Sequence, residues 1–168
     1  MYYAGIGSRG TPQAVLDKMT EIATMLANAG YTLRSGGADG ADNAFYKGCN
    51  NQCEIYIPWE GFNGIENGIC NLSYEHFKLA ESIHPAWYMC KQGGMKLHAR
   101  NTQQILGEHL RTPVDFVICW TKNGEKVGGT ATAIRLAESR GIPVYNIGNP
   151  NHRILLNNLF KDLGFIQQ

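Results

Sequence analysis

The sequence has little excess charge of either sign. Its 168 residues include 15 lysines and arginines against 14 acidic residues, which gives a formal net charge of +1 at pH 7. Proteins that grip duplex nucleic acid through its phosphates usually present a strongly basic surface. The charge balance therefore weakens the case for duplex-DNA binding.

Long apolar runs are also lacking. No stretch approaches the roughly 18 consecutive apolar residues that a membrane span needs, so we expect no contact with a membrane. The opening residues MYYAGIGSRG have no basic segment followed by an apolar one, and we expect no signal peptide. Together these features predict a cytoplasmic protein.

Neither the cysteines nor the histidines are spaced like metal ligands. The five cysteines are odd in number and irregularly placed, which argues against a disulfide framework and suits a reducing compartment. Cys49 and Cys53, taken with Cys70 and Cys90, lack the usual C-x-x-C spacing, and the five histidines form no i, i+4 pair. Buried structural thiols are favoured over a zinc site, and we predict no metal and no cofactor.

Glycine, in contrast, is abundant, and three glycine-rich clusters stand out. They are GIGSRG at 5–10, SGGADG at 35–40 and VGGT at 127–130. Each follows a strand-like run and precedes a helix-like one. The N–H groups at a helix N-terminus are unpaired and carry partial positive charge, and glycine lets an anion approach them. Three such clusters predict a phosphate-bearing, nucleotide-type ligand.

Apolar runs alternate with helical periodicities along the chain. We expect strands at 2–6, 31–34, 54–57, 114–120 and 142–147. We expect helices at about 12–29, 40–48, 74–83, 95–106, 130–140 and 154–163.

This alternation predicts one Rossmann-like α/β domain over residues 1–168, with an open parallel sheet covered by helices on both faces. The region at about 58–92 holds Pro58, Gly61 and two Asn-Gly pairs, and we expect an irregular lid or insert there. In open sheets of this kind, ligands bind at the carboxyl edge where the strand order reverses.

Four segments occur in an order that resembles a known superfamily. They are GIGSR (5–9), LRSGGADGADNAFYKG (33–48), ARNTQQILG (99–107) and VGGTATAIRLAESRGIPVYNI (127–147). This set resembles the DprA/Smf and Lonely Guy (LOG)-like, or SLOG, Rossmann superfamily, and the likeness is greatest to a small single-domain DprA. The resemblance implies a Rossmann-like fold with a nucleotide-type pocket. DprA proteins bind single-stranded DNA, whereas LOG proteins hydrolyse the N-glycosidic bond of nucleoside monophosphates.

The resemblance breaks at the position of the LOG catalytic glutamate. When the chain is aligned on Gly128 and Gly129, Arg135 occupies that position. The carboxylate that would stabilise an oxocarbenium-like centre is missing there, which argues against the LOG mechanism. Binding alone and N-glycosidic hydrolysis both stay open, because another carboxylate could substitute. The carboxylates considered are Asp39, Asp42, Glu60 and Glu75.

The predicted site draws on all three clusters. Phosphate contacts are expected from the first and third clusters, and ribose contacts from the second. Arg100 and Asn101 are expected to lie over the opening of the pocket. Trp120, or the lid aromatics Trp59 and Phe62, would cover the base. The predicted ligand-binding residues are Gly7, Ser8, Arg9, Gly36, Gly37, Asp39, Arg100, Asn101, Trp120, Gly128, Gly129 and Thr130.

The leading hypothesis is a protein that binds, and so sequesters or senses, a nucleotide-derived phosphorylated small molecule. The first alternative is an N-glycosidic hydrolase of the phosphoribohydrolase type. The second is a DprA-like single-stranded DNA binder, which has only the modest basic stretch of Lys91, Lys96, His98 and Arg100 in its favour. We also expect a homodimer or higher homo-oligomer, with the helix face containing Ile105 and Leu106 as its interface.

Overall fold

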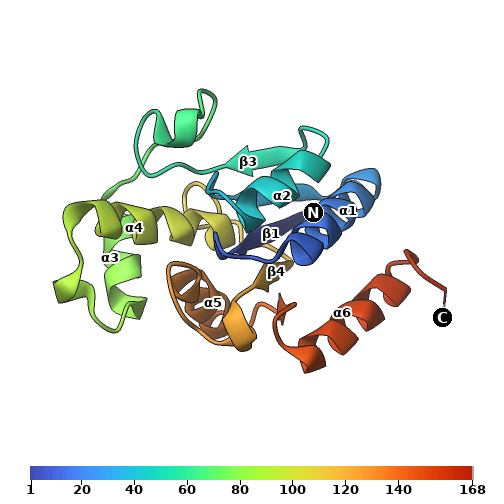
Figure 1. Cartoon of the computed structure of the whole chain (residues 1–168). Helices are drawn as coiled ribbons and strands as arrows, with labels where there is room; N and C mark the ends of the chain where they lie inside the picture. Colours follow the sequence, from blue (N-terminus) through green and yellow to red (C-terminus); the bar gives the residue numbers. More distant parts are fainter. Residues whose placement is uncertain (168) are drawn as a thin grey trace.

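The computed structural model describes residues 1–167 and shows a five-stranded sheet between two layers of helices (Figure 1). All strand pairs are parallel, and the order across the sheet is β3-β2-β1-β4-β5. The predicted fold class, a Rossmann-like α/β fold with an open parallel sheet, is confirmed. The strands are β1 (Tyr2–Gly7), β2 (Thr32–Ser35), β3 (Cys53–Ile55), β4 (Phe116–Trp120) and β5 (Val144–Asn146).

Helices bury both faces of the sheet (Figure 1). The helices of the first face are α1 (Gln13–Asn28), α2 (Ala41–Gly48) and α6 (Pro150–Asp162). The helices of the second face are α4 (Gln92–Leu106) and α5 (Thr130–Ser139), and α3 (Tyr74–Ile83) packs outside them. Three short 3-10 turns are η1 (Phe62–Gly64), η2 (Trp87–Met89) and η3 (Lys122–Gly124).

The central strands are apolar on both sides because each side faces helices. In β4, Phe116 and Ile118 belong to the core cluster on the α1, α2 and α6 side, whereas Val117 and Cys119 belong to the cluster on the α4 and α5 side. The side chains of a strand alternate between faces, so one continuous apolar run fills two separate cores. Within the described residues 1–167, no helix has the length and apolar character to cross a membrane.

Two of the expected helix starts and the expected dimer interface are wrong. α4 begins at Gln92 rather than Met95, because a helix accommodates glycines in its first turn, where its N–H groups need no helical partner. α6 begins at Pro150, where the Asn149 side chain accepts the Asn151 N–H at 3.0 Å and caps the helix. The expected dimer interface at Ile105 and Leu106 is buried in the second core cluster, and cannot face a partner.

Candidate functional site

A cleft of about 500 Å³ opens at the carboxyl ends of β1 and β4. These two strands are neighbours, but the chain leaves β1 toward β2 and leaves β4 toward β5, so their loops diverge. Eight of the twelve predicted ligand-binding residues line this one cleft. They are Gly7, Ser8, Arg9, Arg100, Asn101, Gly128, Gly129 and Thr130.

Arg100 of α4 is the most unusual residue in the cleft, because its side chain is charged and nearly buried, with 5% of the residue exposed. Its Nε donates to Asn101 Oδ1 at 3.0 Å, and its Nη1 donates to the carbonyl oxygens of Gly36 and Tyr56. Its guanidinium lies 5.5 Å from the centre of the Phe62 ring. Among residues 1–167, no acceptor bonds Nη2, which leaves this nitrogen free to donate to a ligand.

The charge of Arg100 is only indirectly balanced. Burial lowers its pKa to about 10, and the nearby Asp42 opposes that shift, so the guanidinium stays protonated at neutral pH. A buried charge is costly unless it is paired or satisfied by hydrogen bonds. The free Nη2 and the incomplete charge balance are both features that a bound anion would satisfy.

Asp42 is a buried residue that lines the cleft, and its Oδ2 accepts the Ala38 N–H at 3.2 Å. Complete burial raises the pKa of this carboxyl to about 6, against the opposing effects of Arg100 and of backbone N–H groups. Of the carboxylates considered as substitutes for the LOG glutamate, Asp42 lines the cleft, whereas Asp39 and Glu75 line other hollows. A carboxyl with this pKa can exchange a proton near neutral pH.

All four residues of the third glycine cluster, 127–130, line the cleft. Gly129 caps α5, and Asn101 Nδ2 donates to its carbonyl oxygen at 2.8 Å. A Cβ on Gly128 or Gly129 would meet no atom of residues 1–167 within 4 Å, and Gly129 has an ordinary φ of −65°. Neither packing nor backbone strain therefore requires glycine at 129. The N–H groups of Gly129 and Thr130 have no partner among the described residues, as expected at a helix start.

The first cluster differs from expectation because most of its amides are already bonded. The Ser8 N–H donates to Trp120 O at 3.1 Å, the Gly10 N–H to Ser8 Oγ at 3.0 Å and the Thr11 N–H to Ser8 O at 3.3 Å. The loop therefore presents the Ser8 hydroxyl hydrogen and the exposed Arg9 side chain rather than a row of free amides. Gly7 is explained by packing, because a Cβ there would lie 2.8 Å from that of Ala41.

Four predicted residues lie outside the cleft. Gly36 packs beneath Arg100, whose Nη1 would lie 2.7 Å from a Cβ at this position. Gly37 and Asp39 border a separate hollow beside β3 and η1, so the predicted ribose contacts do not reach the cleft. Trp120 was expected to stack on a base, but it packs against the first core cluster because strand alternation turns it to that face. Phe62 supplies the aromatic ring of the cleft instead.

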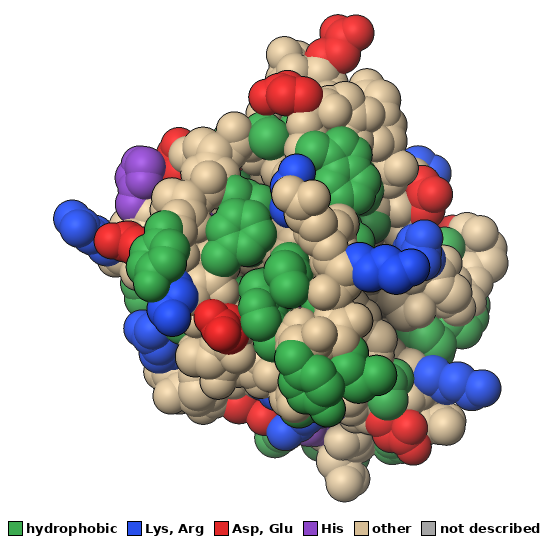
Figure 2. Space-filling view, turned by 90° about the vertical axis from the view of Figure 1, so that its left-hand side faces the viewer, with side chains coloured by type: hydrophobic (Ala, Val, Ile, Leu, Met, Phe, Trp, Pro, Cys, Tyr) green, Lys and Arg blue, Asp and Glu red, His purple; other side chains and the backbone are tan. Residues whose placement is uncertain are grey.

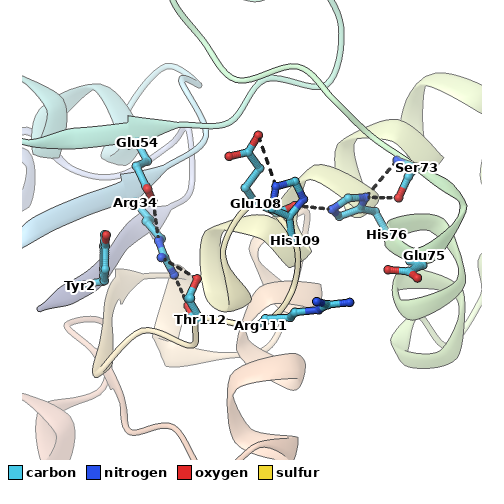
Figure 3. A pocket seen from close by; sticks show the side chains of 10 residues that line it. All are labelled: Tyr2, Arg34, Glu54, Ser73, Glu75, His76, Glu108, His109, Arg111 and Thr112. Atoms are coloured by element: carbon cyan, nitrogen blue, oxygen red, sulfur yellow. Dashed lines mark hydrogen bonds and ion pairs between the residues drawn. The ribbon is translucent and has the colours of Figure 1, made fainter.

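A third cavity, of about 530 Å³, lies where α3 and the 107–112 loop meet β2 and β3 (Figure 3). Its charged and polar groups largely satisfy one another. Arg34 Nε pairs with Glu54 Oε1 at 2.9 Å, and the His76 ring lies between Ser73 and the carbonyl oxygen of Glu108 (Figure 3). This internal pairing leaves it a weaker ligand site than the cleft.

Sequence reasoning missed Gln104 and Lys122, which also line the cleft. Lys122 follows β4 in the polar turn before the third glycine cluster, so its place after a strand was a usable signal. Gln104 lies one helical turn beyond Arg100 on α4, and an i, i+4 relation to a predicted site residue could have identified it.

The chain was compared with known proteins. No family model matches the sequence, and no curated protein matches it. The fold is similar to the solved structure of DNA processing protein A from Helicobacter pylori, described for its unique single-stranded DNA binding mode. The two chains are 19% identical with a TM-score of 0.57, and the match covers 99% of this chain and 74% of that one. The chain therefore has a DprA-like fold, and identity this low says nothing more.

Proposed function

We propose that the cleft binds the phosphate of a nucleotide, held by Arg100 and by the N-terminus of α5. The observation that carries this proposal is that the donors of both elements line one cleft. Arg100, Gly129 and Thr130 all line the cleft, and among residues 1–167 neither Arg100 Nη2 nor the N–H groups of Gly129 and Thr130 have a hydrogen-bond partner. A guanidinium and a helix N-terminus are both strong phosphate donors, and together they suit a dianionic group.

The rest of the cleft suits one nucleoside. Its volume of about 500 Å³ falls within the range of roughly 300–1,000 Å³ that small-molecule sites occupy. Apolar side chains stand beside the polar ones, namely Phe62, Leu97 and Val127. A sugar and base would contact these while the phosphate meets the donors. Sensing or sequestering such a nucleotide is the role we infer.

Calorimetric titration with nucleoside mono-, di- and triphosphates tests this proposal. The informative variant is Gly129→Leu, because Gly129 lines the cleft and a Cβ at this position would meet no atom of residues 1–167 within 4 Å. We expect wild-type binding at micromolar concentrations, and a loss of at least tenfold in the variant with an unchanged melting temperature. Gly93→Leu is the matched control, since this exposed glycine of α4 also has open space around it and lies outside the cleft. Equal affinities in all three proteins would contradict the proposal.

Single-stranded DNA is the second candidate ligand. The structural neighbour is described by its single-stranded DNA binding mode. Figure 2 shows hydrophobic side chains gathered on one face, with lysines and arginines among them. Exposed aromatic residues in the 58–92 region include Trp59, Tyr74 and Tyr88, and exposed rings are the stacking platforms that single strands use.

Competition separates the two candidates. A fluorescent oligothymidylate would be titrated with the protein, and a bound mononucleotide would then be tested as its competitor. A free-nucleotide site predicts tight mononucleotide binding and weak oligonucleotide binding. Tight oligonucleotide binding that mononucleotides cannot displace would favour the second candidate.

A further inference from the structure

Three potential metal ligands meet where α3 is joined to α4. His84 is the residue that caps α3, Cys90 precedes α4, and His98 lies in α4 itself. One ligand atom from each lies within 4.8 Å of the others, and His84 Nε2 is 3.8 Å from Cys90 Sγ. Around one tetrahedral zinc ion, a sulfur and a nitrogen ligand are about 3.6 Å apart. The three side chains are therefore already close to coordinating distance.

The ring of His98 is oriented by a hydrogen bond of the kind found around metal ligands. Its Nδ1 lies 2.8 Å from the hydroxyl of Thr132, which is buried in α5. When Nδ1–H donates to this hydroxyl, the lone pair of Nε2 is free for a cation. Ligating histidines almost always donate their second nitrogen in this way, which fixes the ring and its tautomer.

His84 is packed in place but must change one bond to bind a metal. Its ring meets the His98 ring edge to face, with centroids 4.4 Å apart, and Trp87 packs against it at 6.3 Å. Its Nδ1 accepts the Ala86 N–H at 3.0 Å. A metal on Nε2 places the ring proton on Nδ1, so binding exchanges this hydrogen bond for the coordinate bond. The turn from His84 to Trp87 would shift with it.

We propose that His84, Cys90 and His98 bind one Zn²⁺, with water in the fourth position. One thiolate and two imidazoles form a donor set that zinc favours over magnesium or calcium, which prefer oxygen. The site would fasten the 84–91 connection onto α4 and, through Thr132, onto α5. The site is separate from the cleft, because none of the three ligands is among the residues that line the cleft. The sequence did not reveal it, because the ligands come from three elements at irregular spacing.

Cobalt substitution and zinc competition on the purified full-length chain test the site. We expect one zinc per chain against a chromogenic chelator, and a Co²⁺ adduct with tetrahedral d–d bands and a thiolate charge-transfer band. Cys90→Ser should lose the charge-transfer band and at least tenfold in zinc affinity. Cys70→Ser is the matched control, because Cys70 is another partly buried cysteine and belongs to no ligand cluster of the described residues. Unchanged spectra in Cys90→Ser, or no zinc bound by the wild type, would overturn the proposal.

A second variant distinguishes coordination from simple loss of folding. Thr132→Val should keep the charge-transfer band while lowering zinc affinity by about 10- to 100-fold, the usual effect of losing such a supporting bond. Thr132→Ser should restore the affinity. Circular dichroism would verify that each variant is folded. If Thr132→Val binds zinc as tightly as the wild type, His98 is not held as a ligand and the proposal fails.

Discussion

At the scale of single residues, the cleft depends on how Arg100 is buried. Gly36 leaves room for the guanidinium, and its carbonyl oxygen accepts a hydrogen bond from it. Asn101 Oδ1 accepts a second hydrogen bond, from Nε of Arg100. The same Asn101 also holds the carbonyl of Gly129, so one side chain links the arginine to the start of α5. Two elements that are far apart in the sequence thus present their donors to one small volume.

The buried carboxyl of Asp42 makes stability depend on pH. Its pKa is raised to about 6 in the folded protein, from about 4 in an unfolded chain. The folded state therefore holds this proton more tightly. The contribution of Asp42 to stability is fully present below about pH 4 and is lost as the pH rises through about 6. Asp42→Asn has no carboxyl to titrate, so its free energy of unfolding does not fall in this way. The variant should therefore gain stability relative to the wild type as the pH rises from about 4 to about 6.

Urea denaturation at a series of pH values would measure this effect. Asp39→Asn serves as its control, because it makes the same substitution at an exposed aspartate three residues away. Parallel curves for wild type and Asp42→Asn between pH 4 and 6 would show that the carboxyl is not buried as described.

The same variant tests hydrolysis. If Asp42 replaces the LOG glutamate, chromatography should show base release by the wild type and none by Asp42→Asn.

Arg9 offers a milder test of the phosphate contact. Its side chain is exposed at the rim of the cleft, so Arg9→Ala should leave the free energy of unfolding unchanged. We expect nucleotide affinity to fall by about 1.5 kcal/mol, the lower end for a hydrogen bond to a charged group, because water screens an exposed pair. Calorimetry at low salt would measure it. An unchanged affinity would place the phosphate deeper, on Arg100 and α5 alone.

At the scale of elements, identical substitutions should have opposite effects in a strand and a helix. A Cβ at Gly5 of β1 would lie 2.6 Å from the Phe45 ring and 2.8 Å from Leu33. Gly5→Ala should therefore destabilise the fold by about 1–3 kcal/mol through overpacking. Gly93→Ala in α4 meets nothing within 4 Å and should stabilise by about 0.4–1 kcal/mol, because it restricts the unfolded chain.

Chemical denaturation of the two alanine variants beside the wild type would measure both effects. A stable Gly5→Ala protein would mean that α2 can move off β1 without cost. A destabilised Gly93→Ala protein would mean that the first turn of α4 is not helical.

At the scale of the whole molecule, one sheet separates two cores, and its central strands end at the cleft. With a formal net charge of only +1, the protein lacks the general attraction that polyanion binders use. For single strands, the logarithm of affinity falls with that of salt concentration at a slope of about −0.7 per phosphate neutralised. We expect the salt dependence of oligonucleotide binding to correspond to at most one or two neutralised phosphates. A steeper slope in anisotropy titrations would show a longer basic track than the cleft provides.

Self-association is also a property of the whole molecule, and it stays a prediction. The helix face first expected to serve as the interface is buried, since Ile105 and Leu106 are at most 2% exposed. Any dimer must therefore use another surface. Sedimentation velocity over a range of protein concentrations would measure the oligomeric state, and a monomer at all concentrations would refute the expectation.

Local patterns in the amino-acid sequence predicted the fold class and eight of the residues that line the cleft. Apolar runs such as 114–120 and glycine clusters after strands are local signals, and parallel connection brings their carboxyl ends to one edge. Which groups are free to bind a ligand depends on the tertiary structure. In the fold, Trp120 packs against the first core cluster, and the Ser8 N–H donates to Trp120 O of β4. The Gly10 N–H donates to Ser8 Oγ, and Arg100 Nη2 has no partner among residues 1–167. The fold also brings His84, Cys90 and His98 together. Hydrogen-bond satisfaction and proximity depend on how distant elements pack, and no local pattern records that.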